Sequence, residues 1–151
     1  DDTPSVSCSP ASGSYFTLGI HSVECTVSDD FNNTSEPSFF NVEVKSVEDA
    51  VSDSIKEVED LIGLLPLTDF KNKPGQTWFT NKITKFFDSL NEGDYLGAKS
   101  VLQDEILPKL DGCTTDTGTS PDNSDKLESC SAQFEIRPVI EEAIVKITLL
   151  L

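Results

Sequence analysis

Apolar and polar side chains alternate one by one in two stretches near the start of the chain, residues 22–27 and residues 40–44. A period of two residues is typical of a β-strand with one face against a core and the other in water. Gly13, Gly19 and the polar segment 29–37 separate the alternating stretches and predict turns. Residues 5–45 are therefore expected to form antiparallel β structure without helices.

The period changes at Ser46. This serine is followed by acidic residues at positions 48 and 49, a pattern that favours the start of a helix. Apolar residues then recur every three or four positions to about Leu65, as in an amphipathic helix: Val47, Val51, Ile55, Val58 and Ile62. The same period predicts helices over residues 77–90, 94–110 and 134–150. Short connections between four such helices predict an antiparallel bundle.

Two prolines fall within the predicted helices. Pro108 is expected to kink or shorten the third helix near its end, because proline lacks the backbone N–H that a helix interior needs. Pro138 is expected in the first turn of the fourth helix, where a missing N–H is harmless. The two patterns divide the chain into two predicted domains, residues 1–45 and residues 46–151.

Four cysteines lie in two segments of different character. Three connectivities are open to four cysteines, but each segment holds one pair, which favours Cys8–Cys25 and Cys113–Cys130. The second pair would close a polar loop over residues 113–130. Each bridge would contribute about 3 kcal/mol on the chain-entropy account of cross-linking. Disulfides predict an oxidising compartment, and therefore an extracellular or cell-surface protein.

The chain carries 27 acidic and 11 basic residues, which gives a formal net charge of −16. This charge argues against nucleic-acid binding, since phosphate contacts require clustered lysine and arginine. It also argues against binding to an anionic membrane surface. The apolar end, residues 147–151, is too short to span a bilayer, so no membrane span is expected.

Two groups of oxygen-bearing side chains suggest calcium, a cation that prefers hard oxygen ligands. The first group is Asp29, Asp30, Asn32 and Asn33, and the second is Asp116, Asp122, Asn123, Asp125 and Glu128. Neither group has the spacing of an EF-hand. Aspartate and asparagine are also the commonest turn formers, so the alternative that these residues only shape turns remains open.

Other candidate chemistry is sparse. Overlapping glycosylation sequons begin at Asn32 and Asn33, which is consistent with a secreted glycoprotein. The single histidine, His21, has no nucleophile near it in the sequence, and a surface position is the simpler interpretation. Trp78 could contribute to a sugar-binding surface, whereas Phe79, Phe86 and Phe87 have helical spacing and are expected in a core. No catalytic residues are predicted, and the chain is not expected to be an enzyme.

Residues 3–45 resemble the C-terminal half of an HYR (hyalin repeat) module. The segments that carry the resemblance are VSCSPASGS at 6–14, YFTLGIHSVECTVSD at 15–29, NNT at 32–34 and SFFNVEV at 38–44. The resemblance implies an immunoglobulin-like β-sandwich of extracellular proteins. An intact module is longer, so strands expected before Asp1 are absent. The chain is then expected to be a piece of a larger surface protein, or a subunit that another polypeptide completes.

Residues 46–151 resemble the FIMAH-type helical modules of secreted bacterial and archaeal surface proteins and hydrolases. The segments that carry the resemblance are VEDLI at 58–62, KITKFFDSLNEGDYLGA at 82–98 and IEEAIVKITLL at 140–150. The loop between Cys113 and Cys130 is longer than the family usually carries. The resemblance implies an accessory module without catalytic residues.

These observations predict an α+β protein, a partial immunoglobulin-like antiparallel β-sandwich followed by a small antiparallel four-helix bundle. The predicted function is a non-catalytic structural or adhesion module of a cell-surface, surface-layer or filament protein, assembling by β-strand complementation. The alternative is an accessory binding or spacer region of a secreted carbohydrate-active enzyme. Expected partners are copies of itself, the upstream part of its parent protein, or cell-surface glycans or proteins. No cofactor is expected apart from the calcium considered above.

Overall fold

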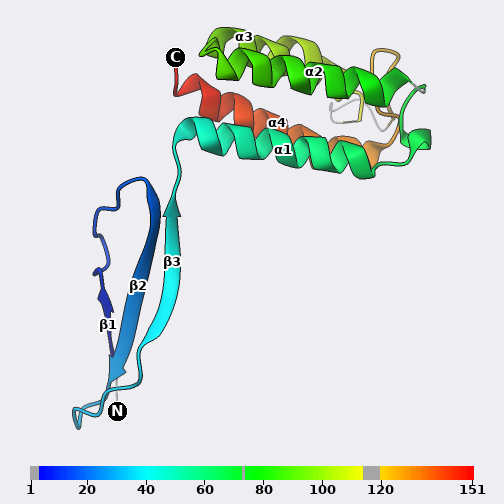
Figure 1. Cartoon of the computed structure of the whole chain (residues 1–151). Helices are drawn as coiled ribbons and strands as arrows, with labels where there is room; N and C mark the ends of the chain where they lie inside the picture. The colour runs from blue at the N-terminus through cyan, green and yellow to red at the C-terminus, as the bar shows by residue number, and fades with distance from the viewer. Residues whose placement is uncertain (1–3, 73, 114–119) are drawn as a thin grey trace. The chain divides into compact units, whose positions relative to one another are not determined.

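The computed structural model describes residues 4–72, 74–113 and 120–151 of the chain. The chain divides into two compact units, Asp1–Ser46 and Val47–Leu151, here called the β unit and the helical unit (Figure 1). Each unit is described by itself below.

The β unit contains three strands, β1 (Ser5–Ser9), β2 (Gly19–Ser28) and β3 (Ser38–Val44). They form one antiparallel sheet in the order β1-β2-β3, so β2 is central and the other two strands are edges (Figure 1). The register places Cys8 opposite Cys25, and Val23 opposite Phe40. The alternation of apolar and polar residues in the sequence matches the alternation of side chains across this sheet.

The two faces of the sheet differ in chemistry. One face, here called the apolar face, carries residues of all three strands that the register aligns: Val6, Cys8, His21, Val23, Cys25, Val27, Phe40, Val42 and Val44. The opposite face carries mainly serine, threonine, asparagine and glutamate, together with the exposed Ile20 and Phe39. Among the described residues of the β unit, Val23 alone is buried, with 3% of its surface exposed. The unit therefore has very little core of its own.

The described residues of the helical unit form four α-helices, α1 (Val47–Leu64), α2 (Pro74–Asn91), α3 (Tyr95–Ser100) and α4 (Cys130–Thr148). Three short helical segments connect them: η1 (Leu67–Asp69), a π-helical segment η2 (Val101–Ile106) and η3 (Leu107–Lys109). Asp94 caps α3 by accepting a hydrogen bond from the Gly97 N–H, and Ser129 caps α4 by accepting one from the Ala132 N–H. These caps fix where the two helices begin.

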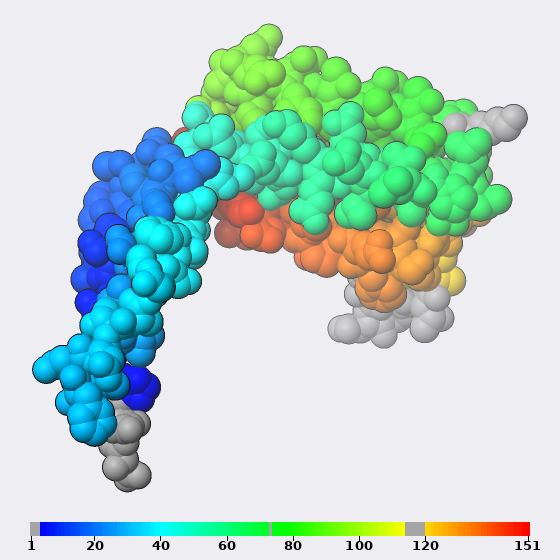
Figure 2. Space-filling model, turned by 60° about the horizontal axis from the view of Figure 1, so that its bottom comes forward, coloured from blue at the N-terminus to red at the C-terminus, as the bar shows by residue number. Residues whose placement is uncertain are grey.

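A continuous hydrophobic core holds the helical unit together. α1 lies beside α4, and α3 lies beside α2 (Figure 1). The space-filling view shows α1 (turquoise) in contact with α2 (green) and with α4 (orange to red) (Figure 2). The largest fully buried side chains are Ile55, Phe79, Ile83, Phe86, Leu102, Ile106, Leu110, Leu127, Gln133, Ile136, Ile140 and Ile147. Within the described part of the chain, no helix combines the length and apolar composition that crossing a bilayer requires.

The predicted fold class is wrong in both of its parts. The first part is not a β-sandwich: residues 4–46 form one small open sheet, and the described residues contain no second sheet packed on it. The HYR-like pattern describes strands that alternate in polarity, and such strands form a single sheet as readily as half of a sandwich. The fold is α+β, with a three-stranded antiparallel sheet and four α-helices.

The second part is not a bundle of four comparable helices. The third predicted helix, residues 94–110, is a six-residue α-helix followed by η2 and η3. In an α-helix, the Pro108 ring would clash with the carbonyl four residues earlier. The winding instead widens before the proline, where the Leu107 N–H donates to the Leu102 carbonyl five residues back. Pro138 also differs from expectation, because α4 begins at Cys130 and places this proline inside the helix.

Candidate functional site

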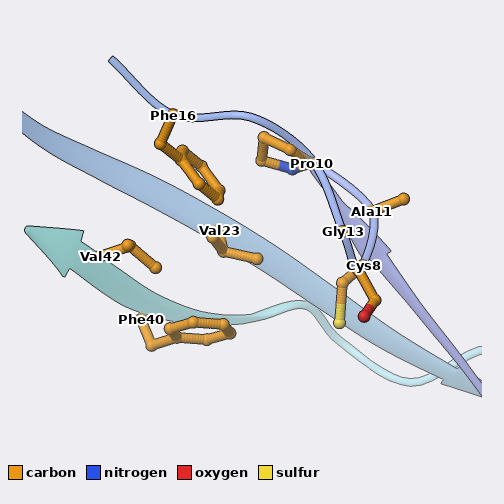
Figure 3. Close-up of a pocket in the computed structure, with 9 residues that line it drawn as sticks. Cys8, Pro10, Ala11, Gly13, Phe16, Val23, Phe40 and Val42 are labelled. Atoms are coloured by element: carbon orange, nitrogen blue, oxygen red, sulfur yellow. The ribbon is translucent and has the colours of Figure 1, made fainter. Parts of the chain in front are cut away.

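The apolar face of the sheet is the main candidate for an interaction site. It contains a hollow of about 230 Å³ lined by Cys8, Pro10, Ala11, Ser12, Gly13, Phe16, Val23, Phe40 and Val42. Figure 3 shows Val23 at the centre of this hollow, with Phe40 and Val42 on one side and Phe16 and Pro10 on the other. The segment that connects β1 to β2 therefore covers only part of the face.

Several apolar side chains of this face remain in solvent. Val6 is 66% exposed and Phe40 is 52% exposed, although the buried Val23 lies directly opposite Phe40. The β unit thus presents an apolar surface that its own residues do not cover. Such a surface, bordered by polar turns, is typical of a site that another polypeptide contacts.

Two contacts fix the shape of the hollow. The Cys8–Cys25 disulfide joins β1 to β2 within the face. The His21 ring lies 5.2 Å from the Phe16 ring, measured between centroids, and its Nε2 lies 2.8 Å from the Thr17 carbonyl oxygen. His21 therefore holds the covering segment in place by donating to a backbone carbonyl. The lining carries one hydroxyl, that of Ser12, and no titratable side chain, so the hollow can accept an apolar side chain but offers no acid or base to activate that hydroxyl.

The first predicted calcium group lies in the turn between β2 and β3, where Asp29 organises the backbone. One Asp29 oxygen accepts hydrogen bonds from the N–H groups of Phe31 (2.9 Å) and Asn33 (2.8 Å), and the other accepts from Asn33 Nδ2 (2.8 Å). Asn32 has a φ of +62° at the tip of this turn, a conformation that asparagine tolerates. The Asp29 carboxylate thus serves the turn. Asp30 is not among the partners of these hydrogen bonds, and calcium binding at this turn stays a prediction.

The hydrogen bond from the Asn33 side chain holds the pKa of Asp29 below its ordinary value of 3.8, with further lowering from the backbone N–H groups. Because this pKa is lower in the folded protein than in the unfolded chain, the ionised carboxylate stabilises the turn at pH values above the unfolded-state pKa. That contribution is lost as the pH falls through the folded pKa. We expect Asn33→Ala to raise the Asp29 pKa toward 3.8, and Asn32→Gly to leave it unchanged, as measured by carboxyl-detected NMR titration. Equal pKa values in both variants would contradict this account of the turn.

The second predicted calcium group is partly assembled. The structure brings Asp122 and Asp125 together with Asp111, so that one carboxylate oxygen of each lies within 4.8 Å of the others. Sequence reasoning missed Asp111, which stands two positions before the predicted polar loop. Asp116 lies outside the described residues.

Asp125 is the central residue of this group and is 1% exposed. Its Oδ1 accepts from the Asp111 N–H (3.2 Å), while its Oδ2 accepts from the N–H groups of Gly112 (3.2 Å) and Asp122 (2.8 Å) and from Gln133 Nε2 (3.0 Å). Both oxygens are therefore occupied by N–H donors from the loop and from α4. This arrangement favours a role in folding the loop, and calcium binding stays a prediction.

The two ends of the polar loop are joined covalently. Cys113 and Cys130 form a disulfide, as Cys8 and Cys25 do, and this is the sequential pairing that the sequence predicts. The buried Gln133 adds a second connection, because its Oε1 accepts from the Cys113 N–H and its Nε2 donates to the Leu127 carbonyl. The disulfide and the hydrogen bonds of Gln133 with Cys113, Asp125 and Leu127 thus tie the loop to the start of α4.

The glycosylation sequons lie in the turn between β2 and β3, and the aromatic residues considered for a core or a sugar-binding surface lie on α2. The Asn33 side chain donates to Asp29, whereas Asn32 is exposed at the tip of the turn; glycosylation of either stays a prediction. Phe79 and Phe86 are fully buried, as the core interpretation predicts, and Phe87 is partly buried against the same core. Trp78 is half-buried, packs edge-on against Phe79, and has two lysine ammonium groups about 6 Å from its ring.

No known protein family matches the chain, and no characterised protein or solved structure is similar enough to count as a match. The HYR and FIMAH resemblances therefore remain predictions. What the fold defines is a disulfide-bonded α+β chain with a small, one-sided sheet and a well-packed helical unit.

Proposed function

We propose that this chain is a non-catalytic structural or adhesion module of an extracellular or cell-surface protein. In this proposal the apolar face of the β unit is its contact surface. The observation that carries the proposal is the exposure of Val6 and Phe40 on the same face as the buried Val23.

Energetics support a partner for this face. A three-stranded sheet with one buried side chain is marginally stable in water. Removing a large apolar side chain from solvent contributes roughly 1.5–3 kcal/mol when burial is complete, and proportionally less for a half-exposed one. Covering Val6 and Phe40 would therefore stabilise both the β unit and the contact. A polypeptide with an apolar surface of its own is the occupant that fits.

Two disulfides support the extracellular part of the proposal, because such bonds persist in oxidising compartments. The chemistry of the hollow supports the non-catalytic part, since its lining offers contact surface and no reactive side chain. The high acidic charge favours solubility and disfavours contact with nucleic acid.

A site-specific photocrosslink tests the contact surface. Phe40 is replaced by p-benzoylphenylalanine, and the protein is irradiated with the surface and secreted fraction of its source. The matched control places the same residue at Ser22, which lies on the opposite face of β2 and is also exposed. We expect a defined crosslinked protein from position 40, identified by mass spectrometry, and none from position 22. Equal crosslinking at both positions, or none at either, would contradict the proposal.

A further inference from the structure

The two edges of the sheet are not equivalent. The Val27 carbonyl accepts from the Ser35 N–H (2.8 Å), and the Val27 N–H donates to Ser35 Oγ (3.0 Å), on the side of β2 where β3 pairs. Odd-numbered residues of β2 therefore direct their backbone groups toward β3, and even-numbered ones toward β1.

This alternation identifies the backbone groups on the outer edge of β3. The pairs Val23↔Phe40 and His21↔Val42 join odd residues of β2 to even residues of β3. The N–H and C=O groups of Phe39, Asn41 and Glu43 consequently point away from β2, to the open edge. β3 contains no proline, and both of its phenylalanines are exposed. Unpaired groups on such an edge are a template for another strand.

The β1 edge is different. By the same alternation, its outward positions are Pro4, Val6, Cys8 and Pro10. Prolines at both ends of this row lack an N–H, which is one way that proteins block pairing at a sheet edge. Only the β3 edge is therefore open to extension in the described β unit.

We propose that the partner of the β unit is a second copy of the same chain, paired antiparallel through β3 with its two-fold axis at Asn41. This inference rests on the proposed function and adds a second contact, at the edge of the sheet that carries the apolar face. Each copy would place the backbone groups of Phe39, Asn41 and Glu43 opposite those of Glu43, Asn41 and Phe39 of the other. A six-stranded sheet with a continuous apolar face would result.

Side-chain chemistry favours this register. On the apolar face, Phe40 of each copy lies opposite Val42 of the other, in the closely spaced type of pair that aromatic and β-branched residues favour. If one strand shifted by one residue, residues whose N–H and C=O groups point to the open edge would lie opposite residues whose groups point toward β2. A shift by two would shorten the overlap of the seven-residue strands.

The charges on β3 itself do not oppose pairing of two copies. Glu43 is the only charged residue within β3, and its carboxylate lies 3.4 Å from the Lys45 ammonium of the same chain. In the proposed register, Glu43 of one copy faces Phe39 of the other, so no like charges lie opposite each other. A stable interface buries roughly 1,200–2,000 Å², and one strand pair falls at or below this range. We therefore expect a weak, reversible dimer whose fraction rises with protein concentration.

Charge-swap variants at the two-fold axis test the proposal on the full chain. Asn41→Lys and Asn41→Asp each place two like charges opposite each other in the dimer, while the exposed position tolerates either in the monomer. We expect sedimentation velocity to show each variant dimerising about five-fold more weakly than the original chain. An equimolar mixture should recover dimers. Asn41→Thr, which keeps the N–H and adds no charge, should dimerise normally.

The outcomes separate this inference from the proposed function. A chain that is monomeric at millimolar concentration would overturn the β3 pairing, as would dimers that neither single variant weakens. A mixture that fails to recover dimers would overturn the position of the axis. If position 40 crosslinks a different protein and never a second copy, the proposed function stands and the β3 pairing is wrong.

Discussion

Replacing Cys8 and Cys25 with serine is expected to unfold the β unit at ambient temperature and to leave the helical unit folded. The disulfide closes a loop of 17 positions, which corresponds to about 3 kcal/mol. With Val23 as the one buried residue among those described in the β unit, hydrophobic burial cannot compensate for that loss. Loss of chemical-shift dispersion for the β2 amides, with α-helical signals retained, would show the effect.

The matched control is the double variant Cys113→Ser/Cys130→Ser. This disulfide spans the same number of positions, but the helical unit has a large core in addition. We expect the control to lower the free energy of unfolding of the helical unit by about 3 kcal/mol without unfolding it. A β unit that stays folded without its disulfide would mean that it holds more stabilising contacts than its burial indicates.

Asp125→Asn is expected to lower the free energy of unfolding of the helical unit by about 3 kcal/mol. The carboxylate accepts from three backbone N–H groups and from Gln133 in a site from which water is nearly excluded. An amide presents an NH2 group at the position of one oxygen, so at least one buried donor loses its acceptor. Each such loss costs about 1–3 kcal/mol. Urea denaturation followed by circular dichroism measures the change.

Asp60→Asn is the control for this variant, because Asp60 is exposed on α1 and its replacement removes the same charge. We expect a change within about 0.5 kcal/mol. A calcium titration adds a second criterion. If millimolar calcium raises the unfolding midpoint of the original chain but not of Asp125→Asn, then Asp125 is a ligand and the loop-folding interpretation is wrong.

The helices show which features of a structure the hydrophobic period predicts and which it does not. α1 occupies the residues that the 3.6-residue period predicts, since its apolar stripe faces one core throughout. The third predicted helix keeps that period to Leu110, yet its backbone changes winding before Pro108. Periodicity records which side chains are buried, and a π-helical turn can bury nearly the same ones. The start of α4 was also missed, because the Ser129 cap lies in a polar stretch without periodicity.

The strands and the site show a similar limit. Alternation correctly places Val23, Cys25 and Val27 on one face with Phe40 and Val42. It cannot reveal whether a second sheet covers that face, because burial by a partner and exposure produce the same pattern. The Asp125 site depends on Gln133 and on backbone N–H groups. No residue pattern in the sequence marks these N–H groups as its donors. Clustered acidic residues therefore predict a metal, which stays a prediction, while the hydrogen-bond donors around Asp125 could not be predicted.

Prolines at the outward positions of β1 have a consequence for assembly size. In a pair of copies joined through β3, both outer strands of the combined sheet are β1, and each ends its outward row with Pro4 and Pro10. A third copy would meet an edge that cannot donate hydrogen bonds at either end. Growth through the sheet should therefore stop at two. The chain would then join two polypeptides as a closed dimer and would not form a repeating fibre.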